Sequence, residues 1–362
     1  MERTSELSTT LNETFKWNKA RINFFVKMLM ALFATRTVNL DRLADGIASD
    51  ADKESRYRRL QRFFALFSID FDTIAGFIFK LFFTNGGKWY LTMDRTNWKW
   101  GKSDINILTL AIAYKGIAIP IYWELLDKRG NSDTQERIDL IEKFTNQFGK
   151  DCIAGILADR EFVGDDWFAW LIKEKIFFYI RIKKNFLTTD SRGRPAHVYA
   201  LFRGATPTQE WILYGKRSVL GSQLYLSALR LPDGELLIVA TNDEPGFAIR
   251  KYALRWEIET LFGCLKSKGF NFESTHITNQ KRIKKLFVLL AIAFCWAHLV
   301  GEWRHDQKKI KIKKHGRPAK SLFRYDLDYI IDAIKDLLSA EFRICLDKIK
   351  FAGRSSVIEG CC

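Results

Sequence analysis

The sequence lacks the residue patterns of several common catalytic and metal sites. Its six cysteines form no C-x-x-C pair and its five histidines are scattered, which argues against a zinc site. It has no G-x-S-x-G motif and no glycine-rich phosphate loop, so neither a nucleophilic triad nor a nucleotide-binding loop is indicated. No hydrophobic signal segment lies near the N-terminus, and we expect free thiols in a reducing compartment.

Long hydrophobic runs are also scarce. One apolar run, residues 286–300, resembles a membrane span, but it is short for a bilayer and contains His298. We interpret it as a buried helix, with a membrane-associated element as the alternative. The sequence shows no internal repeat and no low-complexity segment. We therefore expect a protein without a membrane partner, located in the cytoplasm.

Positive charge is abundant by contrast. The 362 residues include 58 Lys and Arg against 42 Asp and Glu, which gives a formal net charge of +16. Charge of this size favours a polyanionic partner. Hydrophobic residues make up 47% of the chain and aromatic residues 14%, so the charge is carried by a packed protein with a large core.

The N-terminal part is expected to be helical. Its pattern predicts three helices, over residues 18–35, 39–47 and 49–67. Asn39 is the expected N-cap of the second helix. Arg56, Arg59 and Arg62 share the outer side of the third, which suits a helix-turn-helix-like DNA reader. A solvated helix face is the alternative interpretation of these arginines.

The pattern changes to an alternation of strands and helices after residue 87. Strands are predicted over residues 88–98, 105–114, 117–126, 152–162 and 177–184, with helices over 131–149 and 165–175. Ser132 and Gln135 occupy capping-box positions at the start of the first of these helices. Residues 186–245 are richer in strands, including one over 197–202. The whole predicts an α/β layer with a strand-rich insertion.

Two acids end apolar strands. Asp94 follows "WYLTM" and Asp159 follows "CIAGILA". Burying an unpaired carboxylate is costly, so each acid needs a partner. Arg95 and Arg160 follow directly, but alternation along a strand points them to the opposite face. A turn or capping role is the alternative for each acid.

A third acid lies in the segment "YALRWEIETLFGCLKSKGF", residues 252–270, which reads as one amphipathic helix. Tyr252, Arg255, Glu259 and Lys266 fall within roughly 60° of one another, opposite a leucine-rich stripe. This side could be a salt-bridged solvent face. With Asp94 and Asp159, Glu259 would instead complete a set of oxygen ligands for Mg²⁺ or Mn²⁺. Two such ions support phosphodiester chemistry, and the neighbouring bases would hold DNA phosphates.

These residues resemble a known family. The four-residue spacing Y-x2-R-x3-E-x6-K is the signature of a large bacterial insertion-sequence group of DDE transposases, the insertion sequence four family. "MDRTNW" around Asp94 and "ADREF" around Asp159 look like its first two acidic motifs. The arginine-rich "SRYRRLQRFF" is similar to its N-terminal DNA-binding region. The resemblance extends over most of the chain.

The resemblance implies a ribonuclease-H-like catalytic core with a β-strand insertion between Asp159 and Glu259. It implies an all-helical N-terminal DNA-binding domain and a helical, basic C-terminal region. The expected segments are 1–70 (DNA binding), 71–185 (core, first part), 186–245 (insertion), 246–280 (core with the Glu helix) and 281–362 (C-terminal region).

The resemblance also implies cut-and-paste transposition of a bacterial insertion sequence. Asp94, Asp159 and Glu259 would bind two metal ions, while Tyr252, Arg255 and Lys266 would contact double-stranded DNA at the terminal inverted repeats. Trp211, within the insertion, would stack on a flipped base, with a core tryptophan as the alternative. Target DNA is the second substrate, a homodimer on DNA is expected, and the protein would be associated with the nucleoid.

Three other functions fit parts of the pattern. A metal-dependent nuclease of similar core would cut DNA without strand transfer. A DNA-binding derivative would have lost catalysis, although the three acids are intact. A carboxylate-pair sugar hydrolase is disfavoured by the net charge of +16. The basic tract over residues 305–325 is expected to contact phosphates, with a solvated loop as the alternative.

Overall fold

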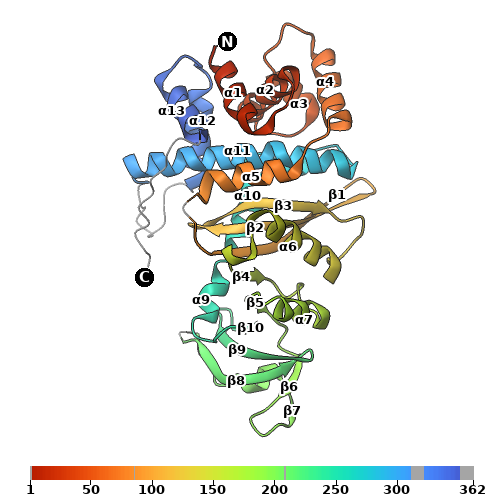
Figure 1. Cartoon of the computed structure of the whole chain (residues 1–362), viewed down its shortest axis with the longest axis vertical. Helices are drawn as coiled ribbons and strands as arrows, with labels where there is room; N and C mark the ends of the chain where they lie inside the picture. The colour runs from red at the N-terminus through yellow and green to blue at the C-terminus, as the bar shows by residue number, and fades with distance from the viewer. Residues whose placement is uncertain (1, 85, 208, 311–321, 351–362) are drawn as a thin grey trace. The chain divides into compact units, whose positions relative to one another are not determined.

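The fold is taken from a computed structural model, which describes residues 2–84, 86–207, 209–310 and 322–350. The chain divides into two compact units (Figure 1). We call the first the helical unit, formed by Met1–Thr84 and Gly263–Cys362, and the second the sheet unit, formed by Asn85–Phe262. The N-terminal helices therefore share one unit with the C-terminal helices. The basic tract expected to contact phosphates lies mostly outside the described residues.

The helical unit is built around one long helix, α11. Helices α2, α4, α5, α12 and α13 all contact it. The elements of this unit are α1 (Glu2–Phe15), α2 (Lys19–Thr35), α3 (Leu40–Gly46), α4 (Lys53–Leu66), α5 (Phe71–Phe82), the 3-10 turn η2 (Phe272–Ser274), α11 (Gln280–Gln307), α12 (Leu322–Ala333) and α13 (Ala340–Ile349).

Helix α11 contains the apolar run and is buried. Within the described residues it is the one helix long and apolar enough to cross a membrane, yet 89% of its most apolar window lies inside the protein. The ring of Trp296 packs edge-on against Phe33 of α2 at 5.5 Å. Its indole N–H donates to the backbone carbonyl of Cys345, at 2.7 Å. The prediction of a buried helix is confirmed.

The three helices expected in the N-terminal part are present as α2, α3 and α4. The Asn39 side chain caps α3 by accepting from the backbone N–H groups of Asp41 and Arg42, as predicted. Helices α1 and α5 were not expected. The sequence suggested that residues 71–84 belong to the catalytic core, but they form α5 and belong to the helical unit.

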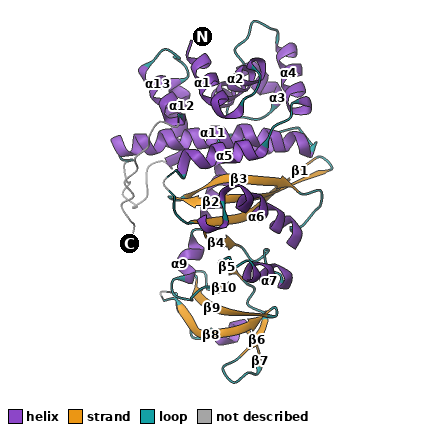
Figure 2. Cartoon of the chain, in the orientation of Figure 1, coloured by secondary structure: helices purple, strands orange, loops and turns teal. Residues whose placement is uncertain are grey.

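The sheet unit contains an eight-stranded mixed sheet (Figure 2). Its strand order is β3-β2-β1-β4-β5-β10-β9-β8, in which β1 is parallel to β4 and β4 to β5, while all other neighbours are antiparallel. The strands are β1 (Trp89–Trp100), β2 (Ser103–Tyr114), β3 (Ile117–Leu125), β4 (Ile153–Ala158), β5 (Phe178–Arg181), β8 (Trp211–Val219), β9 (Ser222–Arg230) and β10 (Leu236–Thr241).

The remaining elements of this unit surround the sheet. Helix α6 contacts β3, and α9 contacts β4, β5, β9 and β10. These elements are α6 (Thr134–Phe148), the 3-10 turn η1 (Lys150–Cys152), α7 (Asp165–Lys173), the hairpin β6 (Leu187–Thr189) and β7 (Pro195–His197), α8 (Val198–Leu201), α9 (Ala248–Ala253) and α10 (Trp256–Leu265). The sheet unit ends within α10, at Phe262.

The strand-rich insertion extends the central sheet. Strand β10 pairs antiparallel with β5 and with β9, so the insertion covers an edge that would otherwise expose unpaired backbone groups. Most of the strands expected there are present. The prediction of a strand over residues 197–202 is wrong, because Val198–Leu201 forms the short helix α8.

The capping box of α6 is displaced by one residue from the prediction. The Asp133 carboxylate accepts from the Glu136 backbone N–H at 2.9 Å, and the Glu136 carboxylate accepts from that of Asp133 at 2.8 Å. Ser132, the expected cap, instead accepts from Nε of Arg137 at 2.9 Å. The need to satisfy a buried guanidinium fixes Ser132 in this second role.

Candidate active site

Two acids lie where the pairing of the neighbouring parallel strands β1 and β4 ends. In the register of β1 and β4, Met93 lies opposite Ala158. Asp94 and Asp159 directly follow these two residues, so both lie at the end of the β1–β4 pairing. The prediction that Asp94 ends its strand is wrong, because β1 continues to Trp100 along β2. Open parallel sheets commonly bind ligands at the carboxyl ends of their strands. The sequence predicted the strands but not this register.

Asp94 is largely buried, and its side chain is 16% exposed. Burial raises the pKa of its carboxyl to about 7, although the positive charge of Arg255 acts against this rise. The Oδ2 atom lies 3.3 Å from Nη1 of Arg255, and Oδ1 accepts from the backbone N–H of Arg95 at 2.7 Å. Asp159 also contributes, since its negative charge raises the pKa of Asp94.

A hydrogen-bond network supports the end of the β1–β4 pairing, next to Asp94. The Arg95 guanidinium binds both carboxylate oxygens of Glu161, at 2.7 and 2.9 Å, and Oδ1 of Asn106 at 2.8 Å. The buried Arg137 donates to the backbone carbonyl of Glu161 at 3.1 Å. Arg95 is therefore held by Glu161 and Asn106, and the cationic partner of Asp94 is Arg255.

Sequence reasoning missed Glu161, Asn106 and Arg137 as supporting residues. The motif "DREF" places Glu161 two residues after Asp159, which was an available indication. The role of Arg137 depends on tertiary contacts. Bidentate pairing of Arg95 with Glu161 fixes the loop that follows β4.

The segment that carries Glu259 is two helices and not one. Helix α9 ends at Ala253 and α10 begins at Trp256, and the backbone N–H of Arg255 bonds to the carbonyl of Tyr252 at 2.9 Å in the turn between them. The prediction of one continuous amphipathic helix is wrong. The turn directs Arg255 inward, so the two flanking helices do not share one polar face.

Arg255 joins the first and third acids. Its side chain is 5% exposed, and it contacts Asp94 through Nη1 and Glu259 through Nη2. The Glu259 side chain is 54% exposed. Arg255 therefore brings a buried acid and an exposed one into a single charged group. The sequence placed Arg255 on an exposed face, whereas the structure buries it.

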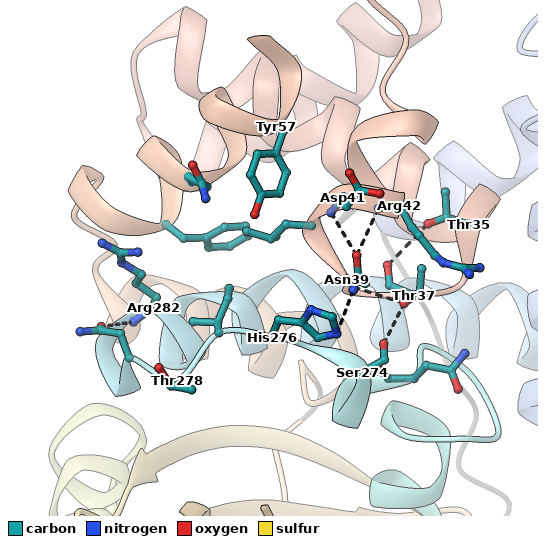
Figure 3. A pocket seen from close by; sticks show the side chains of 16 residues that line it. Thr35, Thr37, Asn39, Asp41, Arg42, Tyr57, Ser274, His276, Thr278 and Arg282 are labelled. Carbon is teal, nitrogen blue, oxygen red and sulfur yellow. Dashed lines mark hydrogen bonds between the residues drawn. The ribbon is translucent and has the colours of Figure 1, made fainter. Parts of the chain in front are cut away.

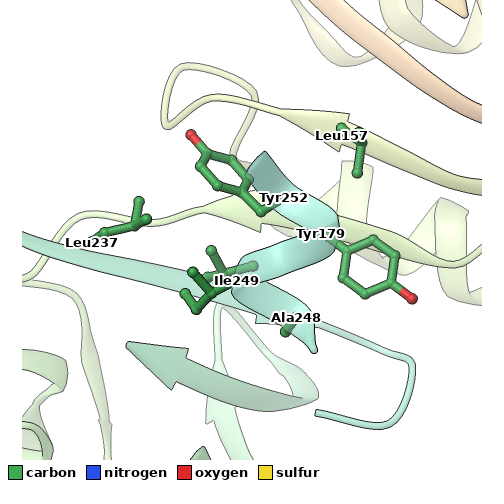
Figure 4. Close-up of a cluster of buried hydrophobic side chains, with 7 residues drawn as sticks. Leu157, Tyr179, Leu237, Ala248, Ile249 and Tyr252 are labelled. Atoms are coloured by element: carbon green, nitrogen blue, oxygen red, sulfur yellow. The ribbon is translucent and has the colours of Figure 1, made fainter. Parts of the chain in front are cut away.

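Tyr252 is fully buried in the core of the sheet unit (Figure 4). It belongs to a cluster with Leu157, Tyr179, Leu237, Val239, Ala248 and Ile249. Burial raises its pKa to about 12, so the phenol stays protonated at neutral pH. The expectation that Tyr252 lines an exposed polar face is wrong, because its ring packs α9 onto the sheet.

A second polar group ties α9 to the sheet. The Tyr179 hydroxyl donates to Oδ2 of Asp243, and Nζ of Lys251 lies 2.8 Å from the same hydroxyl and 3.0 Å from Oδ2. Burial acts to raise the pKa of Asp243, but the hydrogen bonds from Tyr179 and Lys251 outweigh it and lower that pKa. This triad positions the helix directly before Arg255, and sequence reasoning missed it.

The acids are candidate metal ligands. Among the residues that the structure describes, no group of three or more His, Cys, Asp or Glu side chains lies close enough to hold a metal. The oxygen donors of Asp94 and Asp159 fit a hard divalent cation in their chemistry. A buried Asp94 with a raised pKa would gain from a nearby cation. Glu259 is paired with Arg255 in this arrangement.

The other residues expected to contact DNA lie in different surroundings. Lys266 belongs to the helical unit, where its Nζ lies 2.7 Å from Glu273. Trp211 begins β8 and is 42% exposed, and Gly204 allows its ring to lie close to the preceding loop. Its indole is therefore accessible, as a stacking residue requires.

The arginines of α4 differ from one another. Arg59 and Arg62 are exposed, and the Arg59 guanidinium lies over the ring of Phe24 at 4.3 Å. Arg56 is half-buried and donates to the backbone carbonyl of Ser49 at 3.2 Å. The expected shared arginine face is therefore partly engaged within the protein.

A polar pocket in the helical unit lies next to the side of α4 that carries Tyr57 and Gln61 (Figure 3). Tyr57 and Gln61 of α4 line it, together with Arg42, His276 and Arg282. The side-chain nitrogen of Asn39 lies 3.3 Å from Nε2 of His276. Arg56, Arg59 and Arg62 do not line this pocket.

Comparison with known proteins identifies the family. A family model described as a transposase DDE domain matches residues 80–296, which is more than half of the chain. The chain belongs to this family. A cryo-EM structure of the piggyBac transposase synaptic complex with hairpin DNA is similar, with 12% identity, a TM-score of 0.48, and coverage of 99% of this chain and 84% of that chain. A search of curated proteins finds no match.

Family membership gives the activity in general terms. The protein is a DNA transposase, an enzyme that cleaves DNA and transfers strands. DDE transposases generally use divalent metal ions for this chemistry. The mixed sheet, with Asp94 and Asp159 side by side on its central parallel strands, is the part of this chain suited to that role.

Proposed function

We propose that this transposase moves a bacterial insertion sequence of the insertion sequence four type by a cut-and-paste reaction. The observation that carries the proposal is the parallel register of β1 and β4, which places Asp94 and Asp159 together. The link from Asp94 through Arg255 to Glu259 supports a three-acid site. The spacing of Tyr252, Arg255, Glu259 and Lys266 supports the assignment to this type.

The sheet unit is proposed to be ribonuclease-H-like. Support comes from the order β3-β2-β1-β4-β5, in which the first three strands are antiparallel and the last three are parallel. Strands β8 to β10 would be the insertion between Asp159 and Glu259.

Asp94, Asp159 and Glu259 would hold Mg²⁺ or Mn²⁺. Two such ions, when bound, supply polarisation of the attacking hydroxyl and stabilisation of the leaving oxygen. The buried Arg255 positions Asp94 and carries positive charge next to the site. Tyr252 supports Arg255 from the core of the sheet unit.

Binding of the ion can be tested apart from activity. Adding Mg²⁺ should raise the melting temperature of the wild-type protein, because a ligand that binds the folded state stabilises it by about 2.7 kcal/mol at one hundred times its Kd. The variant Asp94→Asn/Asp159→Asn should not respond. Asp139→Asn, on the exposed side of α6, is the matched control and should respond like wild type. An equal response of all three proteins would contradict the metal assignment.

Strand transfer distinguishes a transposase from a nuclease of similar core. Inverted repeats that flank the gene would supply the substrate. A pre-cleaved repeat end, incubated with the protein, Mg²⁺ and a target plasmid, should become joined to the target. Cleavage of intact ends without joining would favour the nuclease, and no cleavage would favour a catalytically silent derivative.

The proposed assembly is a homodimer on the paired ends of the element, at the nucleoid in the bacterial cytoplasm. Bringing two ends together requires two active sites, which is the reason for expecting two copies. Light scattering of the protein bound to a repeat-end duplex should give the mass of a dimer complex. A complex that remains monomeric would rule out this assembly.

A further inference from the structure

Half of the residues that line a pocket of about 650 Å³ in the sheet unit are basic. Six basic side chains line it: Arg160, Arg181, Lys183, Lys184, Arg203 and Arg230. Among the described lining residues, Glu235 is the single acid. The pocket therefore carries a large excess of positive charge.

The single acid cannot neutralise the six cations. Oε1 of Glu235 lies 2.5 Å from Nη2 of Arg181 and 3.6 Å from Nη1 of Arg160. Arg230 donates to the backbone carbonyls of Ala205 and Gly234, at 3.0 and 3.1 Å, which satisfies hydrogen bonds but leaves its charge uncompensated. Like charges gathered in a concave surface are costly unless an anionic ligand binds there.

The lysines of this pocket are held on an ordered turn. The backbone carbonyl of Lys183 accepts from Phe186 at 3.2 Å, and that of Lys184 accepts from Tyr199 at 3.0 Å. The Lys183 and Lys184 side chains remain exposed, and the Tyr199 side chain is 42% exposed at the same pocket. A fixed backbone with exposed cations is suited to phosphates, because less order is lost on binding.

The position of the pocket connects it to the acids. Arg160 directly follows Asp159, and its side chain lines the pocket. Arg181 ends β5, the strand next to β4, and its charge influences the pKa of Tyr252. The pocket therefore adjoins Asp159.

We propose that this pocket binds backbone phosphates of duplex DNA on one side of the bond processed at Asp94 and Asp159. The inference rests on the proposed transposase site and adds a second, sequence-independent contact to it. Phosphate contacts position DNA without reading its sequence, which suits an enzyme that must hold both an element end and varied target DNA.

The test measures binding of a 30-base-pair duplex by fluorescence anisotropy as a function of salt. The pocket variant Lys183→Glu/Lys184→Glu should bind at least about tenfold more weakly than wild type at low salt. Its plot of log K against log salt should be shallower by about 1.8, since each lost phosphate contact changes the slope by about 0.9.

The matched control is Lys102→Glu/Lys173→Glu, which makes the same charge change at two exposed lysines of the sheet unit that do not line the pocket. It should keep the wild-type slope. Melting temperatures of both variants check that the exposed substitutions leave the fold intact. Equal affinity losses and equal slopes in the two variants would overturn the inference.

Failure of this inference can be told apart from failure of the proposed function. If wild type cleaves element ends and the pocket variant binds DNA as the control does, the pocket assignment falls and the transposase site stands. If wild type neither binds nor cleaves element ends, the proposed function itself falls.

Discussion

The acids of the sheet and the acid of the helix are placed by different means. Asp94 and Asp159 are fixed by the hydrogen-bonded register of two parallel strands. Glu259 depends on the start of α10, and its side chain is 54% exposed and held by Arg255. The comparison shows that two members of the site are set by the backbone, whereas the third is set by a side-chain contact that can rearrange.

The largest expected effect is on catalysis. Asp94→Asn and Asp159→Asn should each reduce cleavage of element ends at least about 100-fold, because loss of even one supporting electrostatic group at such a site costs this much. Gel assays of end cleavage measure the effect, with Asp139→Asn as the control. Cleavage by Asp94→Asn at the wild-type rate would show that the strand acids are not the site.

The next effect is on stability, and it separates the two partners of Arg255. Arg255→Ala should lower the free energy of unfolding by about 3 kcal/mol, since it leaves the buried Asp94 without its cation. Glu259→Gln should cost at most about 1 kcal/mol, because that carboxylate is mostly exposed.

Urea denaturation measures both free energies. The double variant Asp94→Asn/Arg255→Ala should cost less than the sum of its single changes, because the two side chains are coupled. Equal costs for Arg255→Ala and Glu259→Gln would contradict the difference in burial on which the comparison depends.

A smaller effect is expected at the triad that holds α9. Asp243→Asn should cost about 1–2 kcal/mol at pH 7, because it weakens charged hydrogen bonds to Tyr179 and Lys251. The pKa of Asp243 is lowered in the folded state, so this contribution is present above its ordinary value of 3.8 and is lost as the pH falls through the folded pKa.

Denaturation at pH 7 and near pH 3 tests this dependence, and the difference between wild type and Asp243→Asn should shrink at the lower pH. Asp151→Asn, at an exposed aspartate of the same unit, is the control and should be neutral at both. A difference that grows on acidification would contradict the assigned sign.

The sequence was a good guide where local patterns dominate. Asn39 was identified as a cap because short polar side chains satisfy free N–H groups at helix starts. The strand that contains Asp94 and the strand that Asp159 directly follows were both indicated by alternating and apolar runs. The cap of α6 was misplaced by one residue, since Ser132 and Asp133 are both suitable caps and only the contact of Ser132 with Arg137 separates them.

The sequence was a poor guide where burial depends on distant residues. A period of 3.6 placed Tyr252 and Arg255 on one outward face, but the chain turns between α9 and α10 and buries both. The same limitation hid the triad of Tyr179, Asp243 and Lys251, whose members come from β5, the loop after β10 and α9.

The amino-acid sequence by itself determined the kinds of most elements and carried the acidic motifs that indicated a transposase, because these depend on local pattern and residue chemistry. The tertiary structure decided that Asp94 and Asp159 are neighbours, that Arg255 lies between Asp94 and Glu259, and that Tyr252 belongs to the core. The physical reason is that strand register and burial arise from contacts between residues far apart in the chain, which no local period contains.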